Sequence, residues 1–472
     1  MVFSSLVFLC IFLPVTLMLY FVVKNQAYRN GLLIITSLLF YAWGEPIWVT
    51  ILIFSAMTDY FHALLVEKYR GSWQSKAALA SSMILNISLL GFFKYWSFIV
   101  QNINLAFGLN LPYSNFHLPI GISFYTFQTI SYVIDVYRGE VAAQKSPFKL
   151  LLFVSLFPQL VAGPILRYKD IAREIDHRTA TLAGFSAGVS RFVTGLGKKV
   201  VFANTAGEIS EFFLKGNVAG LPVLGAWFGI ALFALQIYFD FSGYSDMAIG
   251  LGKMFGFNYK ENFDYPYISR SATEFWRRWH MTLGSFFKDY VYIPLGGNRK
   301  NPVRNLFVVW FLTGLWHGAS WNFIVWGLYY GLLIFVERKV LLKVFGAIPR
   351  WVSHVYFFVT MLIGWVFFYF TDLRIGLRFL GTMFGLGADK LTNAEFLIHF
   401  ENNVLFFVLA IIACFPVKKL LQVWVERLTH QKRAAGLVVN GIVRPAFEFT
   451  VLLISIILLV GKTYNPFLYF RF

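Results

Sequence analysis

Long apolar runs alternate with short polar segments along almost the whole chain. A membrane-spanning helix needs about 20 consecutive apolar residues, and many of these runs approach that length. They cover residues 3–23, 31–43, 46–66, 78–107, 118–136, 148–165, 184–203, 221–250, 303–316, 320–337, 352–370, 402–417 and 446–461. This pattern predicts an all-α, polytopic membrane protein.

Some runs contain residues that interrupt a simple span. The run 118–136 includes Pro119, Gly121 and Asp135, and the run 184–203 includes Arg191. Irregular backbone is tolerated at membrane depth only where protein or a water-filled cavity covers it. We therefore expect about ten to twelve true spans, together with re-entrant and interfacial helices around an internal cavity.

The amino-acid composition also indicates a polytopic membrane protein. Of 472 residues, 58% are hydrophobic and 14% are charged, whereas a soluble chain carries about 25% charged residues. We expect one membrane domain, 1–472. Residues 1–23 lack a basic start and a small-residue cleavage site, which favours a first membrane helix over a cleaved signal. The two cysteines lie in apolar runs and predict neither a disulfide framework nor a metal site.

Basic residues concentrate in three segments between apolar runs, 253–304, 337–350 and 418–433. Such segments face the cytoplasm in most membrane proteins, so the positive charge predicts topology rather than binding to nucleic acid. The hairpin 303–337 then starts and ends on the cytoplasmic side, and the tail 462–472 lies on the outer face.

One histidine, His317, lies at the tip of that hairpin in strongly apolar sequence. An ionisable side chain at membrane depth suggests a functional site, and a neutral imidazole can act as a general base on a hydroxyl. A structural histidine that is hydrogen-bonded inside the helix bundle is an equally good interpretation. Trp316 and Asn322 are candidates to line the site, and Ser320 is a candidate N-cap for the next helix.

A second histidine, His280, ends the string EFWRRWH. Helical spacing would place Trp276 and His280 on one face. The sequence fits an amphipathic helix in the membrane interface, with tryptophans in the aromatic belt. It also fits a helix that lines the cytoplasmic mouth, where Arg277 and Arg278 would bind a phosphorylated donor.

Two acids, Asp240 and Asp246, lie beside an apolar helix in the run 236–252. They suggest a polar cavity wall or partners for nearby basic residues. A structural role in breaking the helix is about as good an interpretation as contact with substrate. The chain contains no HExxH, CxxC or GxSxG motif, so we predict no metal site and no built-in serine hydrolase.

Taken together, several strings resemble the membrane-bound O-acyltransferase (MBOAT) family, in the branch of the alginate O-acetyltransferase membrane subunit and its peptidoglycan-acetylating relatives. The strings are MVFSS, FPQLVAGPILRY, DFSGYSDMAIGLGKMFGF, NFDYPYISRSATEFWRRWHMTLGSFFKDYVYIPLGGNR, GLWHGASWNFIVWG and NPFLYFRF. The resemblance spans nearly the whole chain.

The resemblance implies a ring of helices around a tunnel, with a catalytic core at about 118–340. It implies that His317 is catalytic and that His280 is the second functional position. The donor would be cytoplasmic acetyl-CoA, used as a substrate with no bound cofactor. The acceptor would be a surface polysaccharide such as alginate or peptidoglycan, reached through an extracytoplasmic lipase-like partner at the bacterial inner membrane.

The tail 462–472 carries a further hypothesis. FLYFRF resembles the aromatic motif of the small companion peptide in teichoic-acid D-alanylation, which implies that Tyr469 carries the acyl group. The alternative is an aromatic anchor at the membrane interface, with Tyr464, Phe467 and Phe470 as belt residues.

Two other functions compete with polysaccharide O-acetylation. One is an MBOAT enzyme that acylates a lipid or a protein. The other is a proton-coupled transporter with His317 and Asp240 as relays; it predicts paired inverted repeats, which are not evident in the sequence.

Overall fold

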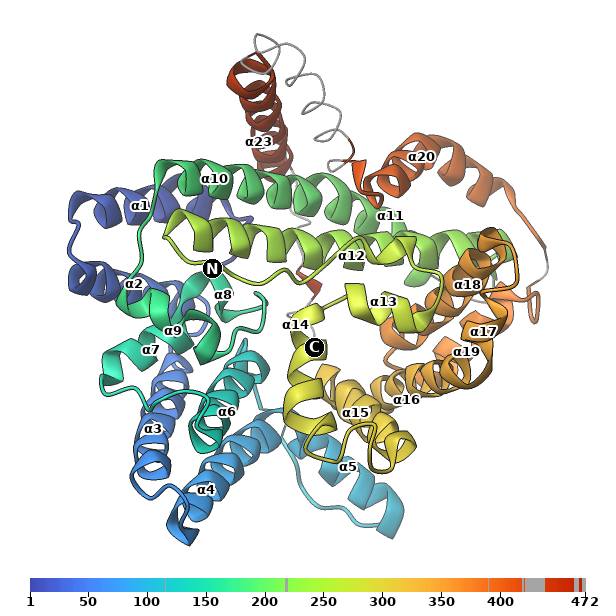
Figure 1. Ribbon diagram of the computed structural model, residues 1–472. Helices are drawn as coiled ribbons and strands as arrows, with labels where there is room; N and C mark the ends of the chain where they lie inside the picture. The colour runs from blue at the N-terminus through green and yellow to red at the C-terminus, as the bar shows by residue number, and fades with distance from the viewer. Residues whose placement is uncertain are drawn as a thin grey trace. The chain divides into compact units, whose positions relative to one another are not determined.

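A computed structural model describes residues 1–114, 116–216, 220–388, 390–417, 420, 438–461 and 467–468. These residues form helices joined by turns, with no strand among them (Figure 1). The prediction of an all-α protein is confirmed.

The chain divides into two compact units, which are described separately. Unit 1 comprises residues 1–192 and 245–261, and unit 2 comprises residues 193–244 and 262–472. Two helices continue from one unit into the other, α10 (Leu182–Gly197) and α12 (Val223–Met254). The expectation of a single domain stays a prediction.

Unit 1 holds the first helices of the chain. Besides parts of α10 and α12, they are η1 (Phe8–Phe12), α1 (Leu13–Val22), α2 (Gln26–Ala42), α3 (Val49–Lys68), α4 (Trp73–Leu90), η2 (Gly91–Tyr95), α5 (Trp96–Phe107), α6 (Ile122–Arg138), α7 (Pro147–Ser155), α8 (Phe157–Leu160) and α9 (Tyr168–Asp176).

The helices of unit 2 lie mostly in the second half of the chain. Besides parts of α10 and α12, they are η3 (Lys198–Ala203), α11 (Asn204–Leu214), η5 (Pro266–Ile268), α13 (Ala272–Arg278), α14 (Met281–Phe287), η6 (Lys288–Tyr292), α15 (Pro302–His317), α16 (Trp321–Val336), η7 (Glu337–Leu341), α17 (Leu342–Val344), α18 (Arg350–Tyr369), α19 (Leu373–Met383), α20 (Ala394–Ala413), η8 (Val439–Val443) and α23 (Arg444–Gly461).

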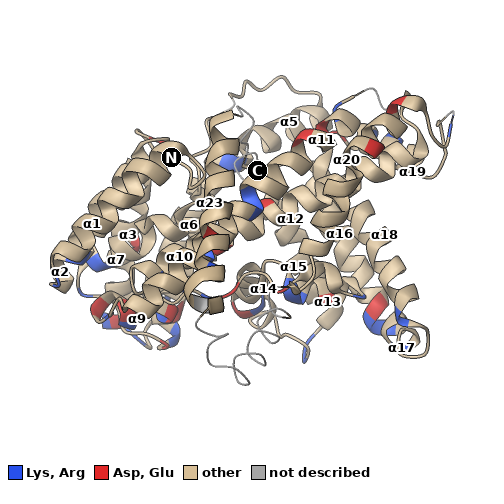
Figure 2. Ribbon diagram, turned by 90° about the horizontal axis from the view of Figure 1, so that it is seen from above, with Lys and Arg blue, Asp and Glu red and all other residues tan. Residues whose placement is uncertain are grey.

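Six helices among the described residues are long and apolar enough to cross a membrane, and most of them match predicted runs. They are Val49–Lys68, Trp73–Phe107, Val223–Met254, Arg350–Tyr369, Ala394–Ala413 and Gly441–Gly461. Charged residues gather at α9 and near α17, while most of the ribbon carries other residues (Figure 2). The protein is therefore a membrane protein, and the expected total of ten to twelve spans stays a prediction.

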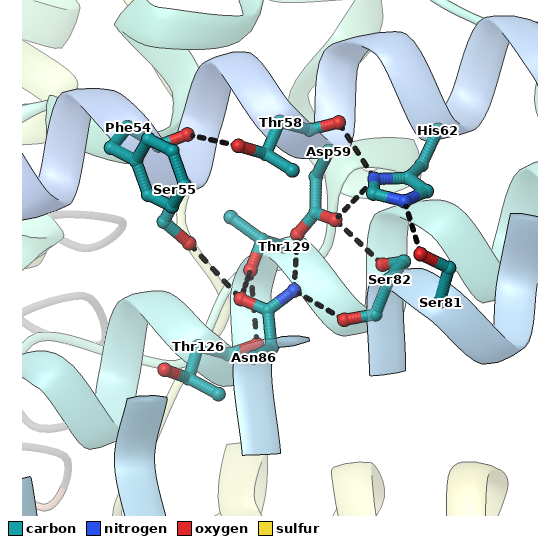
Figure 3. Close-up of polar contacts among 10 residues, drawn as sticks. All are labelled: Phe54, Ser55, Thr58, Asp59, His62, Ser81, Ser82, Asn86, Thr126 and Thr129. Atoms are coloured by element: carbon teal, nitrogen blue, oxygen red, sulfur yellow. Dashed lines mark hydrogen bonds and ion pairs between the residues drawn. The ribbon is translucent and has the colours of Figure 1, made fainter. Parts of the chain in front are cut away.

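A buried carboxylate joins three helices of unit 1, α3, α4 and α6 (Figure 3). Asp59 is fully buried; its Oδ1 accepts a hydrogen bond from Ser82 Oγ at 2.6 Å, and its Oδ2 accepts one from Asn86 Nδ2 at 2.7 Å. Asn86 Oδ1 accepts hydrogen bonds from Ser55 Oγ at 3.0 Å and Thr129 Oγ1 at 3.3 Å. Since buried polar groups are costly unless they are hydrogen-bonded, this network fixes how the three helices meet.

We predict that Asp59→Ala lowers the stability of the protein by about 2 to 3 kcal/mol, because the buried donors of Ser82 and Asn86 lose their acceptor. The decrease is measured as a lower apparent melting temperature of the purified protein in detergent. Asp59→Asn is the matched control, since it keeps one acceptor oxygen, and it should cost less. An Asp59→Ala protein that melts at the wild-type temperature would contradict the proposed role of the network.

Candidate functional site

The geometry around His317 begins with a helical hairpin in unit 2. His317 is the last residue of α15, and α16 begins only four residues later, at Trp321, so the predicted position at a hairpin tip is confirmed. Ser320 occupies the N-cap position of α16, but its hydroxyl makes no capping hydrogen bond. It donates instead to the carbonyl oxygen of Thr371 at 3.5 Å. The prediction that Ser320 is the N-cap residue of the next helix is therefore confirmed, although its side chain does not form the capping hydrogen bond.

Glycines allow α15 and α16 to approach closely. A Cβ atom at Gly327 would lie 2.3 Å from the carbonyl oxygen of Trp310, and one at Gly314 would lie 2.3 Å from that of Phe323. Both contacts are with backbone atoms, which cannot move aside as a flexible side chain can. The two glycines thus fix the hairpin that carries His317.

We predict that Gly327→Ala lowers the acyl transfer activity expected from the sequence at least about tenfold, because α16 must shift away from α15, and small displacements of a catalytic group are costly. Gly91→Ala is the matched control, because a Cβ there meets nothing within 4 Å. The two variants are compared by initial rates of donor consumption at equal amounts of folded protein. Equal activity of both variants would show that the close approach is not needed.

Aromatic rings enclose His317, which is 4% exposed. The centroid of its ring lies 4.9 Å from those of Trp316 and Trp326, and 5.1 Å from that of Phe368, each in an edge-on arrangement. The predicted neighbour Trp316 is thus in contact with His317. Apolar surroundings of this kind exclude water and strengthen the electrostatic interactions inside them.

Three buried polar atoms near these rings have no hydrogen-bond partner among the described residues. They are Nε1 of Trp276, Nε1 of Trp326 and Oδ1 of Asn322. Trp276 and Trp326 are in contact, with ring centroids 5.4 Å apart. The amide nitrogen of Asn322 donates to the carbonyl oxygen of Phe367 at 3.1 Å, which leaves Oδ1 as an acceptor. The large majority of buried polar groups in proteins are satisfied, so these atoms mark a place where a ligand or water can bind.

The segment that carries His280 is not one continuous helix. α13 ends at Arg278, and His280 has a left-handed backbone with φ of 46° at the N-cap of α14. The prediction that Trp276 and His280 share one helical face is therefore wrong, because the chain turns between them.

The two arginines of α13 differ in their surroundings. Arg278 forms ion pairs with Asp264 at 2.9 Å and with Glu274 at 3.1 Å. Arg277 is exposed. Of the two, Arg277 is the better candidate for a phosphate contact.

His280 is 2% exposed and lies against two aromatic rings. Its ring centroid is 4.7 Å from that of Phe241 and 5.9 Å from that of Trp316, the residue before His317. Burial lowers the pKa of His280 to about 3, because a desolvated imidazolium is unfavourable. The rings of His280 and His317 thus both contact that of Trp316.

The acids Asp240 and Asp246 lie inside α12, which continues unbroken past both. The interpretation in which they break the helix is therefore wrong. Asp246 forms an ion pair with Arg191 at 2.6 Å, and Asp240 forms one with Lys199 at 2.7 Å. The interpretation in which they are partners for nearby basic residues is confirmed.

Asp240 also holds part of the tail. Its Oδ2 accepts a hydrogen bond from the backbone N–H of Leu468 at 2.8 Å, and the ring of Phe467 packs on that of Tyr244 with centroids 4.8 Å apart. Phe467 and Leu468 are both buried, so Phe467 is not a residue of the membrane aromatic belt. Tyr469 lies outside the described residues.

Comparison with known proteins identifies the family. The model of the membrane-bound O-acyltransferase (MBOAT) family matches residues 140–377. A probable alginate O-acetylase, AlgI, of Pseudomonas putida is 39% identical over 100% of both chains. A peptidoglycan O-acetyltransferase of Helicobacter pylori is 34% identical over 86% of this chain and 85% of that protein.

The chain belongs to the MBOAT family. It is therefore an acyltransferase. A teichoic acid D-alanyltransferase of Bacillus subtilis is a more distant relative, 26% identical over 56% of this chain and 69% of that protein. The range that matches the MBOAT model contains His280 and His317 and ends before the tail.

Sequence reasoning missed two residues that support this MBOAT site, Asn262 and Glu337. Glu337 is fully buried and accepts hydrogen bonds from the backbone N–H groups of Ala272 and Thr273, both at 2.7 Å. It thus caps the N-terminus of α13, where a negative charge is stabilising. An acid directly after an apolar run was the available signal for Glu337, and the basic residues that follow it obscured that signal.

Metal ligation has no candidate in the described ranges, where no group of three or more His, Cys, Asp or Glu residues comes together.

Proposed function

We propose that the chain is an O-acetyltransferase of the bacterial inner membrane. It takes acetyl from cytoplasmic acetyl-CoA and transfers it toward a cell-surface polysaccharide such as alginate or peptidoglycan. The observation that carries this proposal is the pair of buried histidines, His280 and His317, that both contact Trp316, in a chain matched along its full length by a probable alginate O-acetylase. The transferred group and the acceptors follow the names of the relatives.

In the proposed reaction His317 is the general base. It takes the proton of a hydroxyl, whose oxygen attacks the thioester carbonyl carbon. The new C–O bond forms, the C–S bond breaks, and the leaving thiolate takes the proton from the imidazolium of His317. The reaction thus converts an alcohol and acetyl-CoA into an acetate ester and coenzyme A.

The indole N–H groups of Trp276 and Trp326 are suited to stabilise the negative charge that develops on the carbonyl oxygen. Both are buried and have no hydrogen-bond partner among the described residues. Fixed donors in a water-excluding site stabilise a developing oxyanion strongly because they need no reorganisation. The exposed Arg277 is suited to bind the phosphates of coenzyme A.

The nucleophile in this first step is the hydroxyl of Tyr469. Its acetyl ester is then handed to an extracytoplasmic lipase-like partner, which completes transfer to the polysaccharide. The support for this assignment is the position of the preceding residues, because Phe467 and Leu468 are buried within unit 2 and Leu468 is hydrogen-bonded to Asp240.

We predict that His317→Ala lowers acetyl-CoA turnover by the purified protein about 100-fold or more, because removal of a general base usually lowers the rate by that factor. Turnover is followed as release of the free thiol of coenzyme A. His177→Ala is the matched control, since His177 is exposed in unit 1, and it should retain wild-type turnover. Full turnover by His317→Ala would remove the assignment of His317 as the base.

We predict that Tyr469→Phe abolishes acetylation of the polysaccharide, because the ring remains but the nucleophilic hydroxyl is lost. The measurement is the ester content of the polysaccharide in cells that carry the variant as their only copy. Tyr464→Phe makes the same chemical change elsewhere in the tail and should acetylate normally. Normal acetylation by Tyr469→Phe would leave the aromatic anchor as the role of this tyrosine.

A further inference from the structure

A single buried amide, that of Asn262, is in contact with both His280 and the start of α14. Asn262 is fully buried in unit 2. Its backbone carbonyl oxygen accepts a hydrogen bond from the N–H of Met281 at 3.0 Å. Its Oδ1 accepts hydrogen bonds from Thr282 N at 3.2 Å and Thr282 Oγ1 at 2.9 Å, and lies 3.1 Å from Nδ1 of His280.

These contacts determine which amide atom faces His280. A backbone N–H can only donate, so the side-chain atom of Asn262 that faces Thr282 N is the oxygen and not the nitrogen. An amide oxygen can only accept, so the hydrogen bond to His280 requires a proton on Nδ1. In a neutral imidazole the other nitrogen, Nε2, then carries the lone pair.

We propose that Asn262 is a positioning residue that holds His280 as the Nδ1–H tautomer, so that Nε2 accepts a hydrogen bond from an O–H or N–H group of a bound substrate. This inference rests on the proposed acetyl transfer at His317. It separates the two histidines, since His317 takes the proton of the nucleophile and His280 orients a substrate group.

The surroundings of His280 fit this role. Its pKa of about 3 makes it a poor proton acceptor at neutral pH, whereas a neutral imidazole still accepts hydrogen bonds. The ring contacts those of Phe241 and Trp316, and these contacts restrict its rotation. The left-handed backbone of His280 is unusual for a residue other than glycine, and such conformations cluster at functional sites.

Asn262→Asp tests the proposal through the pH dependence of activity. The carboxylate keeps an acceptor for Thr282 and for Nδ1 of His280, and the lost NH2 group has no hydrogen-bond partner among the described residues. A carboxylate beside His280 stabilises the imidazolium and raises the pKa of His280. Below that raised pKa, Nε2 carries a proton and cannot accept a hydrogen bond.

We therefore expect acetyl-CoA turnover by the Asn262→Asp protein, relative to that of the wild type at the same pH, to fall as the pH is lowered, because protonation of His280 adds to protonation of the base His317. A pH effect on KM for acetyl-CoA identifies the substrate group as an N–H of the donor. An effect on kcat alone identifies it as a group whose hydrogen bond to Nε2 strengthens only in the transition state. Asn298→Asp is the matched control, since Asn298 is exposed and accepts from Tyr292 Oη at 2.6 Å, and its profile should match the wild type. Superimposable profiles of Asn262→Asp and wild type would overturn the proposal.

The tautomer of His280 can also be determined directly in the wild-type protein, independently of its enzymatic activity. Nitrogen-15 NMR of histidine-labelled protein distinguishes Nδ1–H from Nε2–H. We expect one neutral Nδ1–H signal that does not titrate between pH 5 and 9 and is missing in His280→Gln. If every non-titrating histidine is instead the Nε2–H tautomer, the proposal fails. This result does not depend on His317, so failure of the proposed function and failure of the positioning role are distinguishable.

Discussion

The interior of this protein is dominated by one constraint, the cost of placing polar and ionisable groups where water does not reach them. Burying such a group without a hydrogen-bond partner costs several kcal/mol. The burial of Asp59 is offset by hydrogen bonds from donors on a neighbouring helix. The burial of Asp240 is offset by an ion pair with Lys199 and a hydrogen bond from the backbone N–H of Leu468. The burial of Glu337 is offset by hydrogen bonds from the backbone N–H groups at the N-terminus of α13. In each case the buried acid joins segments that are distant in the sequence.

The site follows from the same constraint. Glu337 holds the start of α13 and Asn262 holds the turn at its end, so the segment that leads to His280 is fixed at both ends. The hairpin that carries His317 is fixed by close backbone packing at Gly314 and Gly327. The buried polar atoms near His317 that lack partners among the described residues therefore belong to a rigid setting, as electrostatic preorganisation requires.

Much of the fold could be predicted from the sequence, and less of the local geometry. Apolar runs located most of the long helices, because length and hydropathy determine what can cross a membrane. The position of His317 at a hairpin tip followed from the same pattern. The turn before His280 could not be predicted, since EFWRRWH has the spacing of a continuous helix and contains no glycine or proline. Nor did the sequence show that α12 continues through Asp240 and Asp246, because only their basic partners make two acids tolerable inside that helix.

The sequence by itself determined the class of the protein, its helical architecture, its family resemblance and the two candidate histidines, since these depend on composition and on local strings. The tertiary structure alone decided which groups surround those histidines. The neighbour that sets the tautomer of His280, Asn262, is 18 residues away in the sequence, and Glu337 is 65 residues from the N–H group of Ala272 that it caps. Hydrogen bonds between distant residues leave no periodic pattern in a sequence, so they become visible only when the chain has folded.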